Sequence, residues 1–261
     1  MQQIGNALEG KVAVLTAATR SIGRAIAEAF LAQGARVVIN GRSEDKGAAA
    51  LAEIGAGDRL VFHPGSATDR AVVERLVDVA VEHFGRIDIA VANAGGTGRS
   101  APIIAMPDDE WQYELDLNLN HTFWLTRRAL QHMVPQRSGR VLAISSIEGK
   151  HGKPNVAGYT ANKHAVNGFV KSVAREVGRD GITVNSICPG LVVTDMLYEK
   201  AGAALGVDGV QGLIDRYNAD TALGRCVTPD EIAAMAVLLA SEAGAGITGQ
   251  NISIDAGTAF Y

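Results

Sequence analysis

The stretch KVAVLTAATRSIGRAIAEAF, residues 11–30, decides the fold of this chain. Its first six residues form a short apolar run that is typical of a buried strand. Its last part repeats apolar residues at the spacing of a helix that lies on a sheet, namely Ile22, Ala25, Ile26, Ala29 and Phe30. The turn between them leads straight from strand to helix, a context in which backbone N–H groups can cradle a pyrophosphate. Taken alone, the segment fits a turn that binds nothing equally well.

The alternation that begins here continues along the chain. Short β-branched runs alternate with longer segments of helical period, which is the pattern of repeated βαβ units. Strands are predicted over residues 11–16, 36–40, 59–62, 87–92, 140–145, 183–187 and 251–254, and further helices over about 72–84, 111–134, 156–178 and 229–240. We expect an α/β protein: a three-layer, doubly wound Rossmann fold with a seven-stranded parallel sheet, in a single domain over residues 1–261.

Two segments interrupt this alternation. Residues 95–108 contain two prolines and three glycines and are predicted to be a loop. Residues 191–224 are rich in Gly and Ala and follow a strand, which is where open α/β sheets place loops that contact ligands. We expect the second segment to be a substrate lid.

The composition excludes several classes of protein. The chain has 261 residues, 47% hydrophobic and 20% charged, with 30 Gly and two Cys, so it is neither disordered nor a disulfide scaffold. A net charge of −4 argues against a general nucleic-acid partner. The longest stretch without Asp, Glu, Lys or Arg, residues 181–194, is shorter than the ~18–20 apolar residues that span a bilayer.

The same survey predicts where the chain resides and what it lacks. The N-terminus has no basic region followed by an apolar one, so no secretory signal is readable and we expect a cytoplasmic protein without a membrane partner. Cys188 and Cys226 are then reduced, buried thiols. Neither the cysteines nor the six histidines have the spacing of metal ligands, so no metal site is predicted.

The residues after the second predicted strand bear on the choice of dinucleotide. An acid at this point would bind the ribose 2′-hydroxyl of NAD, whereas an Arg accommodates the 2′-phosphate of NADP. Gly41 stands where the acid would be, and Arg42 follows. Arg20 in the first turn can close on the same phosphate, and two guanidinium groups suit a dianion better than one. We predict NADP(H) in preference to NAD(H); the alternative is that both are solvated surface arginines.

The chemistry is indicated by Tyr159 and Lys163, which are four residues apart on a predicted helix and therefore share a face. An ammonium beside a phenol favours the phenolate, so we expect Lys163 to lower the pKa of Tyr159 toward a range suited to proton exchange with an alcohol. Ser146, at the end of a predicted strand, can hydrogen-bond the substrate oxygen. Asn118 lies in the middle of a predicted helix, where an amide has poor propensity and requires a reason.

In spacing, order and context these segments resemble the short-chain dehydrogenase/reductase family in its shorter form of about 250 residues, over essentially the whole chain. The resemblance implies that Tyr159 is the general acid/base, that Ser146 positions the carbonyl, that Lys163 also holds the nicotinamide ribose and that Asn118 fixes a proton-relaying water. It implies hydride transfer between nicotinamide and a small-molecule ketone or alcohol. Homotetramers are usual in the family, and we carry this over as an expectation.

The resemblance also implies a set of cofactor contacts. In the first turn Ala17 and Ser21 occupy the places where the family usually has two glycines, although the Ser21 hydroxyl can cap the helix or bind phosphate. The implied cofactor residues are Thr16, Thr19, Arg20, Ser21, Ile22, Gly41, Arg42, Ser43, Ser66, Ala67, Asn93, Ala94, Gly95, Tyr159, Lys163, Pro189, Gly190, Val192 and Thr194.

Substrate contacts are predicted on two walls. Glu148 and His151 can reach a polar substrate, but a solvated rim is the favoured interpretation because charged loop tips are normally exposed. On the other wall the sequence offers Leu191, Met196, Leu197 and Tyr198 as an apolar lid, or as ordinary core beneath a mobile flap. An apolar lid suits a ketone or secondary alcohol with an apolar body.

Three other functions remain open at this point. One is an isomerase or dehydratase on the same scaffold, which the motifs do not separate, although the shorter chain length favours simple oxidoreduction. Some relatives of this shape are 3-oxoacyl-carrier-protein reductases, which dock an acidic carrier through basic residues. Arg137 occupies one docking position, whereas Asp180 reverses the charge at the other. The third alternative is a catalytically silent NADP(H)-binding sensor or subunit, which the missing turn glycines favour and which Asn118, Ser146, Tyr159 and Lys163 together oppose.

Overall fold

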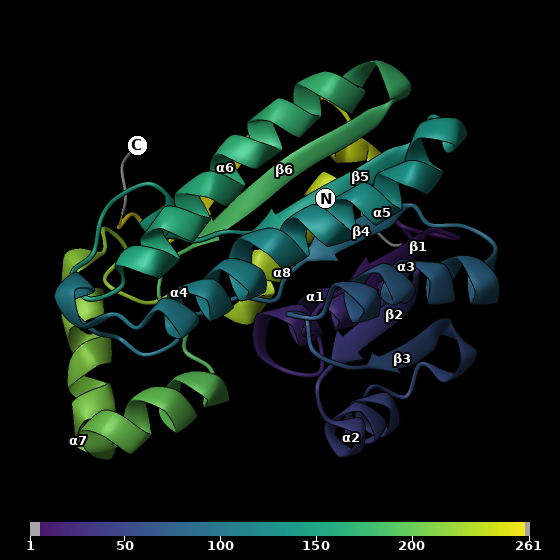
Figure 1. The fold of residues 1–261 in the computed structure, drawn as a ribbon. Helices are drawn as coiled ribbons and strands as arrows, with labels where there is room; N and C mark the ends of the chain where they lie inside the picture. The colour runs from purple at the N-terminus through teal and green to yellow at the C-terminus, as the bar shows by residue number, and fades with distance from the viewer. Residues whose placement is uncertain (1–5, 259–261) are drawn as a thin grey trace.

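The computed structural model describes residues 6–258, and within them seven strands pair in parallel into one sheet (Figure 1). The strands are β1 (Val12–Leu15), β2 (Arg36–Gly41), β3 (Leu60–Pro64), β4 (Ile89–Ala92), β5 (Gly139–Ile144), β6 (Ile182–Pro189) and β7 (Asn251–Ile254). Their order is β3-β2-β1-β4-β5-β6-β7, so the chain reverses its winding direction between β1 and β4. The predicted fold is confirmed, and ligands of such sheets bind at this switch point, beyond the carboxyl ends of the strands.

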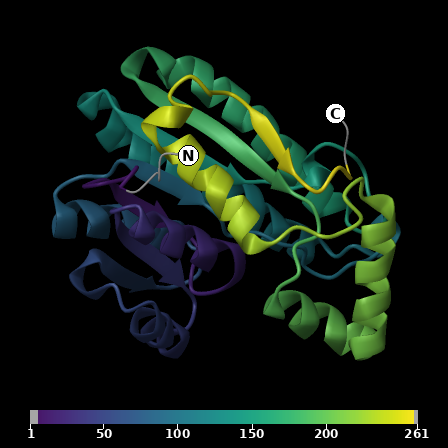
Figure 2. The ribbon, with the colours of Figure 1, turned by 180° about the vertical axis from the view of Figure 1, so that it is seen from behind.

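Helices cover both faces of the sheet and make three layers (Figures 1 and 2). One core lies between the sheet and the helices α1 (Ser21–Ala32), α2 (Glu44–Ile54) and α8 (Pro229–Ala240). The other lies against α3 (Arg70–Phe84), α5 (His121–Gln136) and α6 (Ala157–Val177). Because both faces of the sheet are covered, its strands are continuous apolar runs, as in β1 and β4, where every residue is buried.

Local signals in the sequence fix several helix ends. Thr228 caps α8 through a capping box with Glu231, and Pro229 stands in its first turn. The helix α3 begins after the Asp69 cap and ends at Gly85, which adopts a left-handed conformation.

Three elements differ from the prediction. The helix α2 was not predicted, and its Ser43 cap accepts a hydrogen bond from the Lys46 N–H. The predicted helix over 111–134 is α4 (Asp108–Leu115) followed by a π-helical turn, Asp116–Asn120, and then α5. The predicted lid segment, residues 191–224, is not a loop, because α7 (Asp195–Asp220) occupies most of it, with one break at Gly206.

None of the helices in the described part of the chain is both long enough and apolar enough to cross a bilayer.

Candidate active site

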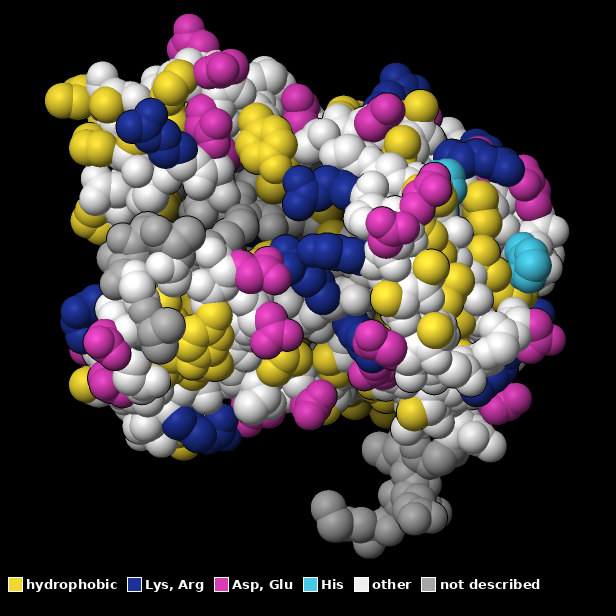
Figure 3. Space-filling model, turned by 90° about the horizontal axis from the view of Figure 1, so that it is seen from below, with side chains coloured by type: hydrophobic (Ala, Val, Ile, Leu, Met, Phe, Trp, Pro, Cys, Tyr) yellow, Lys and Arg dark blue, Asp and Glu magenta, His cyan; other side chains and the backbone are white. Residues whose placement is uncertain are grey.

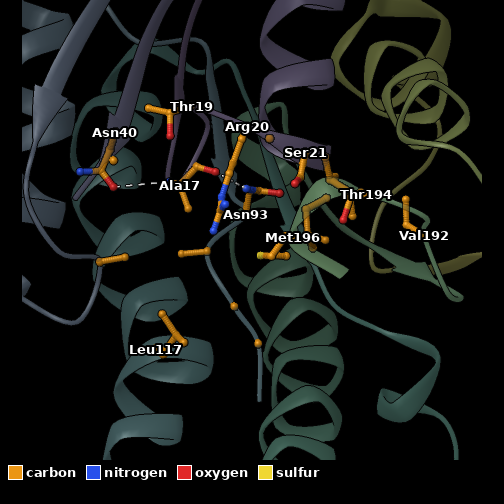
Figure 4. A pocket seen from close by; sticks show the side chains of 18 of the residues that line it. Ala17, Thr19, Arg20, Ser21, Asn40, Asn93, Leu117, Val192, Thr194 and Met196 are labelled. Atoms are coloured by element: carbon orange, nitrogen blue, oxygen red, sulfur yellow. Dashed lines mark hydrogen bonds between the residues drawn. The ribbon is translucent and has the colours of Figure 1, made fainter. Parts of the chain in front are cut away.

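A cavity of about 600 Å³ opens beyond the carboxyl ends of β1, β2, β4, β5 and β6 (Figure 4). Its volume falls within the range of ~300–1,000 Å³ that is usual for ligand and cofactor sites. It brings together most of the sites predicted from the sequence: Thr19, Arg20, Ser21, Ile22, Gly41, Arg42, Ser43, Ser66, Ala67, Asn93, Ala94, Gly95, Ser146, Tyr159, Lys163, Pro189, Gly190, Val192, Thr194 and Met196.

The first turn forms one end of this cavity. Ala17 and Ser21 have φ angles of 51° and 53°, so both non-glycine residues adopt the left-handed conformation that glycine adopts most easily. The Asn40 side chain turns toward Ala17 and accepts a hydrogen bond from its N–H at 3.4 Å (Figure 4). Thr16 lies beneath the turn, where its hydroxyl accepts from the N–H groups of Asn93 and Ala94, both at 2.9 Å. Thr16 therefore holds the turn against β4 instead of lining the cavity.

The N-terminus of α1 faces this turn and has features of a phosphate site. Arg20, at the N-cap position, makes no side-chain capping hydrogen bond, and Ser21 begins the helix instead of capping it. Gly23 allows the turn to pack closely, because a Cβ there would lie 2.4 Å from the Asn93 Nδ2 and 2.7 Å from the Ala17 carbonyl oxygen. Uncapped N–H groups at a helix N-terminus bind anions well. The turn therefore fits a dinucleotide pyrophosphate even without the two glycines.

Three cationic side chains line the same end of the cavity. Arg42 directly precedes the Ser43 cap of α2, Lys46 lies in the first turn of α2, and Arg20 reaches the cavity from the first turn. Figure 3 shows Lys and Arg side chains beside Asp and Glu around the hollow in this face of the molecule. Arg20 forms an ion pair with Glu199 of α7 at 2.5 Å. Lys46 was missed from the sequence, because α2, which carries it to the cavity, was not predicted.

Ser146, Tyr159 and Lys163 line the other end of the cavity. Lys163 is 2% exposed, its Nζ donates to the Ile144 carbonyl at 2.8 Å and lies 5.5 Å from the centre of the Tyr159 ring. Burial lowers the pKa of Lys163 to about 8. Burial also raises the pKa of Tyr159, with a further increase from the Glu148 charge and an opposing effect of the Ser146 hydrogen bond. The expectation that Lys163 brings the Tyr159 pKa down is wrong for this geometry, because burial dominates.

Asn118 is fully buried in the π-helical turn and does not line the cavity. Its amide donates to the carbonyl oxygens of Glu114 at 2.8 Å and Gly96 at 3.0 Å, and its Oδ1 accepts from the Gly96 N–H at 3.0 Å. Asn118 therefore fixes the loop that follows β4, and this is a reason for an amide in mid-helix.

The predicted substrate residues are only partly brought together. Met196 lines the cavity beside Thr194, whereas Leu191, Leu197, Tyr198 and His151 do not. Glu148 is not part of a solvated rim: the residue is 9% exposed and its carboxylate accepts a hydrogen bond from the Ser146 hydroxyl.

Further lining residues were not predicted from the sequence. They are Ala17, Gly23, Asn40, Lys46, Gly96, Tyr113, Leu117, Ile144 and Ser145. Most are direct neighbours of predicted residues, but Tyr113 and Leu117 reach the cavity from α4 and the π-helical turn, which only the folded chain brings there. In residues 6–258, no group of three or more His, Cys, Asp or Glu side chains is arranged to hold a metal ion.

Comparisons with known proteins agree with this geometry. A family model described as Enoyl-(Acyl carrier protein) reductase matches residues 16–259. The 3-oxoacyl-(acyl-carrier-protein) reductase of Salmonella typhimurium is 38% identical over 251 residues, 95% of this chain and 97% of that protein. The D-beta-hydroxybutyrate dehydrogenase of Cupriavidus necator is 34% identical over 256 residues, 96% and 98% of the two chains. A crystal structure of an actinorhodin polyketide ketoreductase variant with NADPH matches with a TM-score of 0.89 and 33% identity, over 98% of this chain and 100% of that one.

Proposed function

The chain belongs to the short-chain dehydrogenase/reductase family, oxidoreductases that act on CH–OH groups, and from this premise we propose that it interconverts a small-molecule ketone and its secondary alcohol with NADP(H). The observation that carries the proposal is the cavity itself. One end offers an uncapped helix N-terminus and three cations, and the other offers Ser146, Tyr159 and Lys163. A dinucleotide that spans the two ends would set its reactive ring beside the phenol.

The residues at the first end fit a phosphorylated dinucleotide. The N-terminus of α1 would hold the pyrophosphate, and Arg42, Lys46 and Arg20 would surround a 2′-phosphate. The presence of NADPH in the matched ketoreductase structure supports the same choice. When bound, the nicotinamide supplies or accepts the hydride, so the protein contributes positioning and proton transfer.

Tyr159 is proposed to move the proton. In ketone reduction its hydroxyl donates to the carbonyl oxygen as the carbon is reduced, and in alcohol oxidation its phenolate takes the hydroxyl proton. Because burial raises the Tyr159 pKa, the group stays protonated at neutral pH, ready for reduction. For the same reason the rate of alcohol oxidation should increase with pH through the alkaline range.

The test is Tyr159→Phe. Removal of the hydroxyl should lower kcat at least about 100-fold, within the range that general acid–base groups contribute, with little change in NADPH affinity measured by cofactor fluorescence. Tyr198→Phe is the matched control, because Tyr198 is 41% exposed and does not line the cavity. If Tyr159→Phe kept more than a few per cent of the wild-type rate, the assigned role would be wrong. NADPH binding by a wild type without turnover on any ketone would favour the silent sensor.

The substrate class is the open part of the proposal. The name of the Salmonella relative favours 3-oxoacyl thioesters. Docking of an acidic carrier through Arg137 is disfavoured, because Arg137 pairs with Asp180 at 3.3 Å and donates to the Arg179 carbonyl at 2.9 Å. We therefore place free ketones and small thioesters ahead of carrier-bound ones. Rates on a 3-oxoacyl carrier, its coenzyme A analogue and simple ketones distinguish these classes.

A further inference from the structure

Glu148 is a buried carboxylate for which the proposed chemistry has no role. It lies in the 3₁₀ turn Ile147–Gly149, directly after β5, and its side chain is 11% exposed. Burial of a carboxylate is costly unless it is paired and hydrogen-bonded. Its two partners are the Ser146 hydroxyl, which donates to Oε2, and Lys153, whose Nζ lies 3.6 Å from Oε1. Glu148 therefore stands between the cavity and a surface lysine.

The turn that carries Glu148 is anchored on both sides. The Ser146 hydroxyl accepts from the Glu148 N–H at 3.2 Å, so the two residues are joined twice. The Asn167 amide of α6 donates to the Gly149 carbonyl at 2.9 Å. The carboxylate is thus held in place by the same helix that carries Tyr159 and Lys163, and its position is set by the fold instead of by a mobile loop tip.

Lys153 continues the connection to the lid. Its Nζ donates to the Tyr217 hydroxyl at 2.6 Å and lies 5.0 Å from the centre of the Tyr217 ring. Tyr217 belongs to the last turns of α7, the helix whose first turn contributes Met196 to the cavity. A chain of four polar groups therefore runs from Ser146 through Glu148 and Lys153 to Tyr217.

We propose that Glu148 is a positioning residue: its carboxylate fixes the hydroxyl of Ser146 and, through Lys153 and Tyr217, links the proton-transfer end of the cavity to α7. In this structure the Ser146 hydroxyl donates to Glu148. This contact fixes the orientation of the Ser146 hydroxyl beside Tyr159. This inference rests on the proposed oxidoreductase function, which it deepens by assigning the group that orients Ser146.

The charge of Glu148 reaches Tyr159 as well. Titratable groups that face Tyr159 or contact its backbone come from five elements, and they are Lys163 of α6, Glu148 after β5, Cys188 of β6, Tyr217 of α7 and Glu114 of α4. Among them Glu148 is joined to the Ser146 hydroxyl, which itself bonds to Tyr159. Its negative charge disfavours the phenolate and so contributes to the raised pKa of Tyr159.

The first test is Glu148→Gln, which keeps the shape of the side chain and removes its charge. The pH profile of alcohol oxidation should shift to lower pH by about one unit, because loss of a nearby like charge favours the phenolate. Ultraviolet difference spectroscopy of the phenolate, with Glu148→Gln/Tyr159→Phe as the blank, reads the same shift without turnover. Glu82→Gln on α3 is the control, since this exposed carboxylate pairs with Arg75 and does not line the cavity.

The second test is Lys153→Met, which should shift the pH profile of alcohol oxidation to higher pH, by less than Glu148→Gln shifts it to lower pH. The reason is that the Glu148 carboxylate near Tyr159 would no longer be compensated by the Lys153 charge. The double variant should behave like Glu148→Gln alone, since Lys153 acts through Glu148. If Glu148 had only a structural role, Glu148→Gln would lower the free energy of unfolding but would shift neither the pH profile of alcohol oxidation nor the phenolate spectrum. That result would overturn the inference. Absence of wild-type turnover on any alcohol or ketone would instead refute the proposed function, while the spectroscopic arm would still report on Glu148.

Discussion

At the scale of single residues, the first turn is held in a conformation that its side chains do not favour. Ala17 and Ser21 are left-handed, which costs an L-residue roughly 1–2 kcal/mol relative to the right-handed form. Glycine would avoid this cost, although its greater conformational freedom in the unfolded chain lowers the free energy of unfolding by about 0.5–1 kcal/mol. The balance still favours glycine at both positions.

Ala17→Gly should therefore increase the free energy of unfolding by about 0.5–1 kcal/mol, which corresponds to a rise in Tm of about 1–3 °C for a chain of this length. Thermal unfolding followed by circular dichroism measures it. Ala49→Gly, at an exposed right-handed position in α2, is the matched control and should lower Tm. A lower Tm in both variants would mean that the Ala17 methyl packs better than its backbone angle indicates.

Cofactor choice is also decided by single residues. The simplest substitution that should favour NAD is an acidic residue at position 41. It is sterically disfavoured, because a Cβ on Gly41 would lie 2.7 Å from the Thr19 Cγ2. Removing Arg42 and Lys46 is the cleaner change. Arg42→Leu/Lys46→Leu should lower kcat/KM with NADPH at least about tenfold, because the two proposed charged contacts with the 2′-phosphate would be lost, and leave kcat/KM with NADH nearly unchanged.

The measurement is initial rates with each dinucleotide. Arg175→Leu on the exposed face of α6 serves as the control. An equal decrease of kcat/KM with NADPH and with NADH would show that Arg42 and Lys46 do not select for the 2′-phosphate.

At the scale of elements, the sequence predicted each of the seven strands in residues 6–258 but misjudged three helical segments for identifiable reasons. The helix α2 has only two buried residues, Gly47 and Ala50, so it lacks the apolar stripe that a periodicity search detects. The many Gly and Ala residues of α7 hide its helical period in the same way, and Gly206 breaks it. Glu148 was misplaced because its burial depends on Lys153 and Ser146, which meet it only in the folded chain.

The π-helical turn is an element-scale feature with a testable consequence. It holds one residue more than an α-helical turn, so deletion of Leu119 should restore a regular helix. Six residues of α5 are buried, whereas Glu114 is the one buried residue of α4, so α5 is the more firmly packed of the two helices. We therefore expect α5 to stay in place, and α4 and Asn118 to rotate about the helix axis by the ~100° that one residue spans. Asn118 would then lose its hydrogen bonds with Gly96, and kcat should fall at least about tenfold.

Steady-state rates and far-ultraviolet circular dichroism check this prediction together. Leu119→Ala keeps the residue count and should retain the turn and the activity. Full activity in the deletion variant would show that Asn118 need not hold the loop.

At the scale of the whole molecule, the strand order explains why the site was readable in outline. Parallel strands present their carboxyl ends at one edge, so motifs spread from the first turn to Thr194 converge there without any knowledge of side-chain contacts. Tyr159 and Lys163 could be found because they are four residues apart on one helix, and Ser146 because it follows a strand. Tyr113 and Leu117 could not, since helix rotation about the π-helical turn decides which side chains enter the cavity.

The ion pair between Arg20 and Glu199 joins the first turn to the start of α7 across 179 residues of sequence. On the proposed assignment, a 2′-phosphate at this end of the cavity competes with the Glu199 carboxylate for the same guanidinium. The arrival of one anion releases the other, and with it the start of α7. The start of α7 would then be released only after the dinucleotide is in place, which favours a compulsory order of addition: dinucleotide first, ketone or alcohol second.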